Sequence, residues 1–174
     1  VLGGAKISDA FGMMESVLKN GTADKILTTG VTGIIMHIAN GVTFGEPQMK
    51  FLRDRDMLSF VDAAKKYLTE YPDRFELPRD LAYNKDGARA NGPAGIYEQD
   101  GFDVGTRGIW GGIADSDAYS VIGGGDTVSS ATKFIDLTKI SYVCTAGGAM
   151  VRFMSGKKLP LIAAMEQAYE RQKL

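Results

Sequence analysis

Hydrophobic positions in the first half of the chain recur every three to four residues, as on one face of a helix, and short apolar runs separate these stretches. The clearest stripe contains Met57, Phe60, Val61, Ala64 and Leu68 and ends at a proline. A first helix is expected to be capped by a serine or an aspartate, at position 8 or 9. The pattern predicts helices over 9–19, 33–39 and 56–71, strands over 25–29, 74–77 and 81–84, and a polar loop over 43–54.

Helical and strand patterns alternate regularly in the second half. The pattern predicts helices over 105–116, 126–135, 147–154 and 159–174, and strands over 119–122 and 140–145. Strands that alternate with helices form βαβ units, because parallel neighbours need a crossover between them. We therefore expect an α/β chain, folded as a three-layer Rossmann-like domain with a mainly parallel sheet and helices on both faces.

The alternation of helix and strand patterns is interrupted between the two halves. Residues 84–89 form one turn-like segment, residues 90–93 form another, and no helix or strand pattern separates them. Either a long loop lies here or a segment is missing between Arg89 and Ala90.

Composition narrows the class of protein. The 174 residues have the length of one domain, and 20 basic against 21 acidic side chains argue against a broad contact with nucleic acid or anionic lipid. No apolar run approaches the length of a membrane span. The single cysteine excludes an internal disulfide and suits a reducing, cytoplasmic location. Because the chain begins with Val1 rather than Met, we expect a fragment or a processed chain.

The 22 glycines are clustered rather than spread. Three times an apolar strand pattern runs into glycine and then into a helix, at residues 27–30, 121–127 and 143–148. In an open parallel sheet these strand ends line one edge, where glycine lets an anion approach the free N–H groups of a helix. The pattern predicts a phosphate-binding edge; the alternative is three tight turns without a ligand.

Several polar residues near this edge have both a chemical and a structural interpretation. Asp126 would bind Mg²⁺ between its carboxylate and phosphate oxygens, or cap a helix. Lys6 would neutralise phosphate charge or lie on the surface, and Glu98 would accept ribose hydroxyls or be solvated. His37 lacks a second ligand at metal spacing, so we expect a buried, hydrogen-bonded side chain, and Cys144 is expected in the core.

The common nucleotide-binding motifs do not fit. The chain has no GxxxxGK[ST] motif, which excludes a P-loop NTPase. The 123–128 segment lacks the third glycine of the dinucleotide motif and carries Asp126 instead, which argues against a Rossmann-type dehydrogenase.

A set of motifs nevertheless recurs in a specific order. They read GGAK at 3–6, LPRD at 77–80, NGPAGIYE at 91–98, GT at 105–106, GGGDT at 123–127, TAGGA at 145–149 and GKKLP at 156–160. In this order the chain resembles the C-terminal, nucleotide-binding domain of phosphoglycerate kinase from end to end, in an archaeal-like form.

The resemblance implies that the domain binds ATP or ADP with Mg²⁺. The family moves a phosphoryl group reversibly from 1,3-bisphosphoglycerate to MgADP, giving 3-phosphoglycerate and ATP in glycolysis and gluconeogenesis. By motif, Glu98 would hold the ribose, Asp126 the magnesium, and Gly30 would border the adenine. The remaining implied nucleotide contacts are Asn91, Pro93, Gly95, Gly124, Gly125 and Thr127, and the implied catalytic positions are Lys6, Gly147 and Gly148.

Departures from the family pattern limit the expectation. The 174 residues do not contain the family's N-terminal, phosphoglycerate-binding domain, so the chain alone is expected to be inactive. Ala10 stands where many members have a second lysine, and Ala146 would be strained if its position required a positive φ. A strand–helix–strand segment with a DIG motif would fall between Arg89 and Ala90. The alternative is a non-catalytic adenine-nucleotide-binding module, which Ala10 and Ala146 favour slightly.

Overall fold

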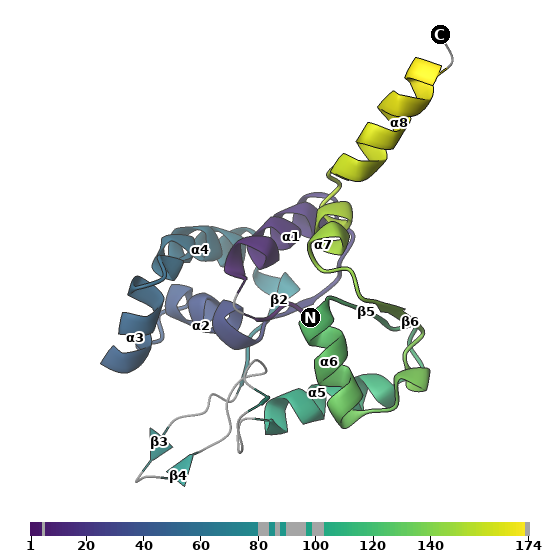
Figure 1. Ribbon diagram of the computed structural model, residues 1–174. Coiled ribbons are helices and arrows are strands. Elements are labelled where there is room, and N and C mark those ends of the chain that lie inside the picture. Colours follow the sequence, from purple (N-terminus) through teal and green to yellow (C-terminus); the bar gives the residue numbers. More distant parts are fainter. Residues whose placement is uncertain (5, 80–83, 86–87, 90–96, 99–102, 173–174) are drawn as a thin grey trace.

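A computed structural model of the chain describes residues 1–4, 6–79, 84–85, 88–89, 97–98 and 103–172, and for 84–85 and 88–89 only the backbone pairing is described (Figure 1). The first half contains two short strands and several helices. They are α1 (Ile7–Lys19), β1 (Ile26–Leu27), α2 (Gly30–Ala39), α3 (Glu46–Arg53), η1 (Met57–Phe60), α4 (Val61–Glu70), η2 (Pro72–Arg74) and β2 (Phe75–Glu76).

The second half alternates helices and strands, as the sequence pattern predicts. It contains α5 (Val104–Ala114), β5 (Val121–Gly123), α6 (Gly125–Phe134), η3 (Leu137–Lys139), β6 (Tyr142–Cys144), α7 (Gly148–Met154) and α8 (Pro160–Gln172). Between the halves, β3 (Asn84–Lys85) pairs antiparallel with β4 (Ala88–Arg89). The predicted strand over 81–84 lies outside the described residues except for Asn84.

Two parallel strand pairs give the chain its α/β character. In the first, Ile26 of β1 lies opposite Phe75 of β2, and a bridge from Leu2 to Thr28 adds the N-terminal segment beside β1. In the second, β5 and β6 run parallel in register over three residues each. Helices pack against both pairs, as Figure 1 shows, which confirms the predicted Rossmann-like class. Among the described residues, no strand joins one pair to the other.

Each strand pair has its own hydrophobic core. The first core contains Met14 of α1, Ile35 and Met36 of α2 and Leu52 of α3, all four fully buried. The second core is smaller and joins Trp110 of α5, Ile122 of β5, Ala131 of α6 and Ile140. All the buried members of the first core precede residue 80, and those of the second follow residue 102. The halves meet through a contact between α1 and α7.

The predicted loop over 43–54 is wrong, because α3 occupies most of it. Gly45 is the N-cap residue, and Pro47 lies in the first turn, where a missing N–H costs no intrahelical bond. Ion pairs from Arg53 to Glu46 and from Lys50 to Asp54 support the helix on its exposed side. Glycine and proline in the sequence therefore mark the start of a helix rather than a loop.

Some predicted boundaries are also wrong. The N-cap of α1 is Lys6, two or three residues before the serine and aspartate that we expected to cap it. The turn between β1 and α2 is shorter than predicted. Helix α2 therefore begins at Gly30, three residues earlier than expected. The predicted helix over 56–71 begins as the 3₁₀ turn η1, preceded by Asp56 in a left-handed conformation with φ 53°.

The last helix, α8, extends away from the body of the chain (Figure 1). None of its described residues is buried. The apolar side that the sequence predicts is present, and its members are Leu161, Ile162, Met165 and Tyr169, each about half exposed or more. No helix in the described ranges is both long enough and apolar enough to cross a membrane.

Candidate nucleotide-binding site

The turn from β5 into α6 is built from consecutive glycines. Gly124 is the N-cap of α6, with φ 99° and ψ 141°, a region that side chains rarely adopt. Its N–H donates to the carbonyl of Cys144 at 3.1 Å, and its own carbonyl accepts from the N–H of Val128 at 2.9 Å. The turn is thus anchored to the end of β6 while the first N–H groups of α6 remain available.

The turn from β6 into α7 lies directly beside the first one. A Cβ placed on Gly124 would lie 3.9 Å from the Cα of Gly147, the N-cap of α7, so the two glycine backbones nearly touch. The first helical residues, Gly125 and Gly148, are both exposed. Two helix N-termini therefore open at the same edge, each with free N–H groups and a partial positive charge. This arrangement suits the oxygens of a phosphate chain.

Asp126 lies in the first turn of α6 and is exposed. The alternative interpretation of this residue as the N-cap is wrong, because Gly124 occupies that position and no side chain caps the helix. Nowhere in the described part of the chain do three histidine, cysteine or carboxylate side chains gather as a metal cluster. A single carboxylate still fits Mg²⁺, which commonly takes one or two protein carboxylates and completes its shell with phosphates and water.

Lys6 lies at the start of α1, and its side chain is exposed. The preceding loop runs against the turn between β1 and α2, since a Cβ on Gly3 would overlap the side chain of Thr29. Gly30, the first residue of α2, has φ 56° and is buried. The contact of α1 with α7 brings the helix that Lys6 begins alongside the helix that Gly148 begins.

Glu98 is exposed, and the neighbouring Tyr97 ties this segment to α6. The carbonyl of Tyr97 accepts from Lys133 Nζ at 3.1 Å, and its ring meets that of Phe134 edge-on, with the centroids 6.1 Å apart. Burial, followed by the negative charges of Glu98 and Asp126, raises the pKa of the Tyr97 phenol. The phenol therefore lies within electrostatic reach of both carboxylates. The predicted contacts Asn91, Pro93 and Gly95 lie outside the described residues.

Tyr97 and Lys133 are the residues that sequence reasoning missed at this edge. The only available signal was the position of Tyr97 immediately before Glu98, because the pairing with Lys133 spans 36 residues.

Two residues set aside at the sequence level meet the expectation only in part, because neither is buried. The Nε2 atom of His37 lies 2.8 Å from the carbonyl oxygen of Pro78, while its Nδ1 is buried with no partner among the described residues. The ring is thus half-satisfied rather than fully hydrogen-bonded. Cys144 is half-buried on β6. Ala146 is unstrained, because Asp56 is the only non-glycine in the described part with a positive φ.

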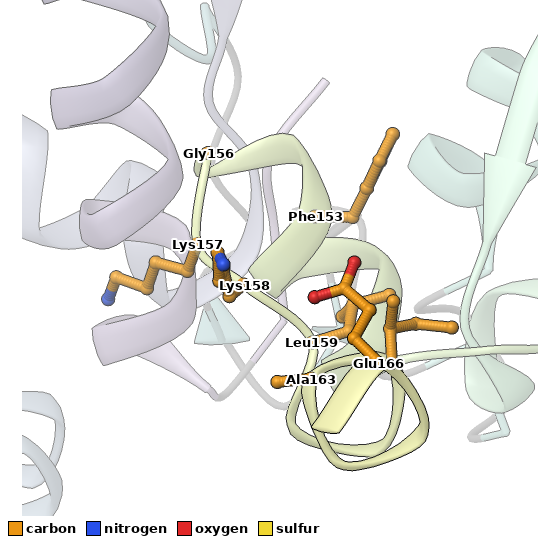
Figure 2. Close-up of a pocket in the computed structure, with 8 residues that line it drawn as sticks. Phe153, Gly156, Lys157, Lys158, Leu159, Ala163 and Glu166 are labelled. Carbon is orange, nitrogen blue, oxygen red and sulfur yellow. The ribbon is translucent and has the colours of Figure 1, made fainter. Parts of the chain in front are cut away.

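A shallow hollow of about 330 Å³ lies apart from these glycine turns, between the end of α7 and the start of α8. Its walls combine the exposed ring of Phe153 with Lys157, Lys158 and Glu166, and Lys157 and Phe153 extend in opposite directions from the connection (Figure 2). The hollow holds none of the predicted site residues.

Comparison with known proteins identifies relatives over the whole chain. The chain is 34% identical to phosphoglycerate kinase of Thermococcus onnurineus and 35% identical to that of Pyrococcus furiosus, covering 98% of this chain and 51% of each relative. The crystal structure of phosphoglycerate kinase from Pyrococcus horikoshii is similar, with a TM-score of 0.85 and 30% identity over 97% of this chain and 51% of that one. The chain thus spans about half the length of these relatives.

The alignments also include positions of the relatives that have no counterpart in this chain. The alignment to the Thermococcus onnurineus relative extends over 211 residues, whereas 98% of 174 residues is about 171, so about 40 positions of the relative have no counterpart here. The sequence profile of the phosphoglycerate kinase family matches in two blocks, residues 1–90 and 86–157. Together these blocks cover most of the residues of this chain. The chain therefore belongs to the phosphoglycerate kinase family.

Proposed function

We propose that this chain is the nucleotide-binding half of a phosphoglycerate kinase, which transfers a phosphoryl group reversibly between 1,3-bisphosphoglycerate and MgADP. The observation that carries the proposal is the approach of Gly124 to Gly147, which sets the N-termini of α6 and α7 at one edge. Family membership and the matching motifs support the choice of reaction. The compartment we propose is the cytoplasm, which suits the single cysteine.

In this proposal the protein contributes position and charge rather than a covalent intermediate. The backbone N–H groups of Gly125 and Thr127 and the open turn at Gly124 receive the nucleotide phosphates. The N-terminus of α7, at Gly147 and Gly148, faces the transferred group, and Lys6 neutralises its oxygens. Bound magnesium would supply further neutralisation of phosphate charge, and Asp126 is the residue that would hold it.

In our proposal the nucleoside lies beside the glycine turns, between Glu98 and the turn at Gly30. Glu98 accepts the ribose hydroxyls, and its neighbour Tyr97, held by Lys133, positions the segment. Asn91, Pro93 and Gly95 belong to the same NGPAG motif and complete the contacts by resemblance. The turn at Gly30 borders the adenine through its neighbours, since Gly30 itself is buried.

Turnover in this proposal needs a second, phosphoglycerate-binding domain. The chain spans about half the length of its relatives, and exposed apolar side chains such as Leu161 on α8 are typical of a surface that another domain contacts. We expect the 174 residues to bind MgADP without catalysing transfer.

Calorimetry with ADP tests the nucleotide site. We expect the chain to bind ADP more tightly with Mg²⁺ than without it, and Asp126→Asn to remove that magnesium dependence. The matched control is Asp117→Asn, which changes an exposed aspartate away from the glycine turns. Absence of ADP binding to a folded sample counts against the site. An unchanged magnesium effect in Asp126→Asn counts against Asp126 alone.

A second candidate is a non-catalytic module that binds adenine nucleotide. One observation favours it: Ala10 is 6% exposed on the packed face of α1, so the start of this helix offers Lys6 as its only lysine before residue 19. Adding a phosphoglycerate-binding domain in trans separates the two, since a kinase half gains activity and a binding module does not.

A further inference from the structure

The C-terminal end of α6 contacts the segment that carries Glu98 through two consecutive side chains. Lys133 Nζ donates to the carbonyl of Tyr97 at 3.1 Å, and the same ammonium group lies 5.6 Å from the centre of the Tyr97 ring. The ring of Phe134 meets the Tyr97 ring edge-on, with the centroids 6.1 Å apart. Tyr97 is thus held through both its backbone and its ring, and Glu98 is the next residue in the chain.

The same end of α6 also contacts the start of α5. The guanidinium of Arg107 lies over the other aromatic ring, that of Phe134, at 5.4 Å from its centre. Arg107 donates to the carboxylate of Asp103, the N-cap of α5, at 2.6 Å. Helices α5 and α6 pack side by side (Figure 1). Positions 97 and 103 are therefore both held against one turn of one helix.

The other end of α6 belongs to the proposed phosphate site. Asp126 and Lys133 are seven residues apart, close to two helical turns, so they lie on the same face of α6, about 10 Å apart along its axis. The phenol of Tyr97 is within electrostatic reach of Asp126 as well as of Glu98. One helix thus begins at the phosphate turn and holds the Glu98 segment at its far end.

Ribose recognition depends closely on the position of the Glu98 carboxylate. A carboxylate accepts two neighbouring hydroxyls only when its oxygens lie at hydrogen-bonding distance from both, so a small displacement of the backbone loses one or both bonds. The Glu98 side chain is exposed, so the position of its carboxylate follows from the backbone that carries it. That backbone is held at Tyr97 by an ammonium donor, and a hydrogen bond from a charged group is stronger than a neutral one.

We propose that Lys133 is a positioning residue for ribose recognition. By holding Tyr97, it places the Glu98 carboxylate where it accepts the hydroxyls of a ribonucleotide, and it thereby determines the preference for ADP over nucleotides that lack those hydroxyls. Lys133 acts through Tyr97 and does not touch the nucleotide itself. This role rests on the proposed function, because Glu98 has a ribose to hold only if the chain binds nucleotide.

The test compares ADP with 2′,3′-dideoxy-ADP, each with Mg²⁺, by calorimetry on the full chain. We expect the wild type to bind ADP about tenfold or more tightly than the dideoxy analogue, which is the ratio that one charged hydrogen bond supplies. Lys133→Met keeps an apolar side chain of similar length and removes the charged donor. It should weaken ADP by about threefold or more and leave the dideoxy analogue within about twofold, because the phosphate contacts are unchanged.

Three further variants separate positioning from folding. Lys133→Arg keeps a charged donor and a cation over the ring, so it should restore the preference for ADP. Lys139→Met removes another exposed lysine, which pairs with Asp115 at 3.4 Å, and should affect neither nucleotide. In a Glu98→Gln chain, Lys133→Met should not change the preference further, since the carboxylate it positions is gone. Because Lys133 is exposed, its variants should melt within about 3 °C of the wild type.

Two kinds of result would overturn the positioning role while leaving the nucleotide site in place. The first is equal weakening of both nucleotides by Lys133→Met, which would indicate a general structural effect. The second is a preference for ADP that is the same in Lys133→Met as in the wild type, or that the wild type does not have. Absence of ADP binding to the folded wild type would instead overturn the proposed function, and the role of Lys133 with it.

Discussion

The Cα of Gly147 lies 3.9 Å from the point where a side chain on Gly124 would begin. Two turns that are more than twenty residues apart in the sequence therefore share one position at the end of the β5–β6 pair. A Cβ on Gly124 would be in van der Waals contact with Gly147, so the two backbones lie close together at this point. This contact is the geometric basis of the proposed phosphate site.

Replacing Gly124 with alanine tests the backbone conformation of this turn through stability. Gly124 has φ 99° and ψ 141°, so alanine there would be strained by its backbone conformation, whereas its Cβ would make only van der Waals contact with Gly147. We expect Gly124→Ala to lower the free energy of unfolding by about 1–3 kcal/mol. Urea denaturation followed by the fluorescence of the single tryptophan measures the loss.

The neighbouring Gly125→Ala is the control. Gly125 begins α6, and a Cβ on it would meet nothing within 4 Å. Alanine favours helix over glycine, so stability should rise by up to about 1 kcal/mol. If both substitutions cost the same, the special role of Gly124 is wrong.

The second core depends on one buried hydrogen bond. Trp110 Nε1 donates to Ser130 Oγ at 2.8 Å, and both side chains are 6% exposed. Ser130→Ala leaves the indole N–H without this partner, and we expect a loss of about 1–3 kcal/mol by chemical denaturation. Ser129→Ala, on the exposed side of the same helix, should change stability by no more than about 0.5 kcal/mol. Equal costs would mean that the bond contributes nothing.

Tyr97 makes alkaline stability depend on pH. Burial, followed by the charges of Glu98 and Asp126, raises the pKa of its phenol in the folded chain. A raised pKa means that the folded state holds its proton more tightly, so the stabilisation is present below about pH 10 and is lost as pH rises through the folded pKa. Tyr97→Phe should therefore lose less stability than the wild type on going above pH 10.

The same phenol reports on Asp126. Asp126→Asn removes one of the charges that raise the pKa of Tyr97, so that pKa should fall, as measured by carbon-13 NMR of the tyrosine rings. Asp117→Asn should leave it unchanged. If the pKa of Tyr97 did not respond to Asp126→Asn, the phenol of Tyr97 would not be electrostatically coupled to Asp126.

The exposure of α8 has a measurable consequence in this chain. Leu161 is 72% exposed, whereas Leu52 of α3 is fully buried. We expect Leu161→Ala to change the unfolding free energy by about 0.5 kcal/mol or less, and Leu52→Ala to cost about 2–5 kcal/mol. A large cost at Leu161 would show that α8 packs against the body in solution.

Sequence periodicity predicted the strands and helices after residue 104 to within about two residues. In that region local signals agree, because each apolar run ends in glycine and a helical pattern follows. The prediction from periodicity failed at α3. There Gly45 and Pro47 mark the start of a helix because Leu52 is buried on the packed face of that helix. That burial is a tertiary fact, and propensity alone does not supply it.

The site was predicted more unevenly. The turns at Gly124 and Gly147 follow from the strand–glycine–helix pattern, because parallel strands end at one edge. The N-cap at Gly124 rather than Asp126 depends on a backbone conformation that only glycine adopts easily. The link from Lys133 to Tyr97 spans 36 residues, and no local pattern contains it.

The most direct test of the account is a titration of the ¹⁵N-labelled chain with MgADP, followed by two-dimensional amide NMR. We expect the largest shifts at Gly124, Gly125, Thr127, Gly147 and Gly148, where the N-termini of α6 and α7 meet. Amides of α3 and α8 should stay unchanged. Saturable shifts confined to other residues, or no shifts from a folded sample, would contradict the proposed nucleotide site.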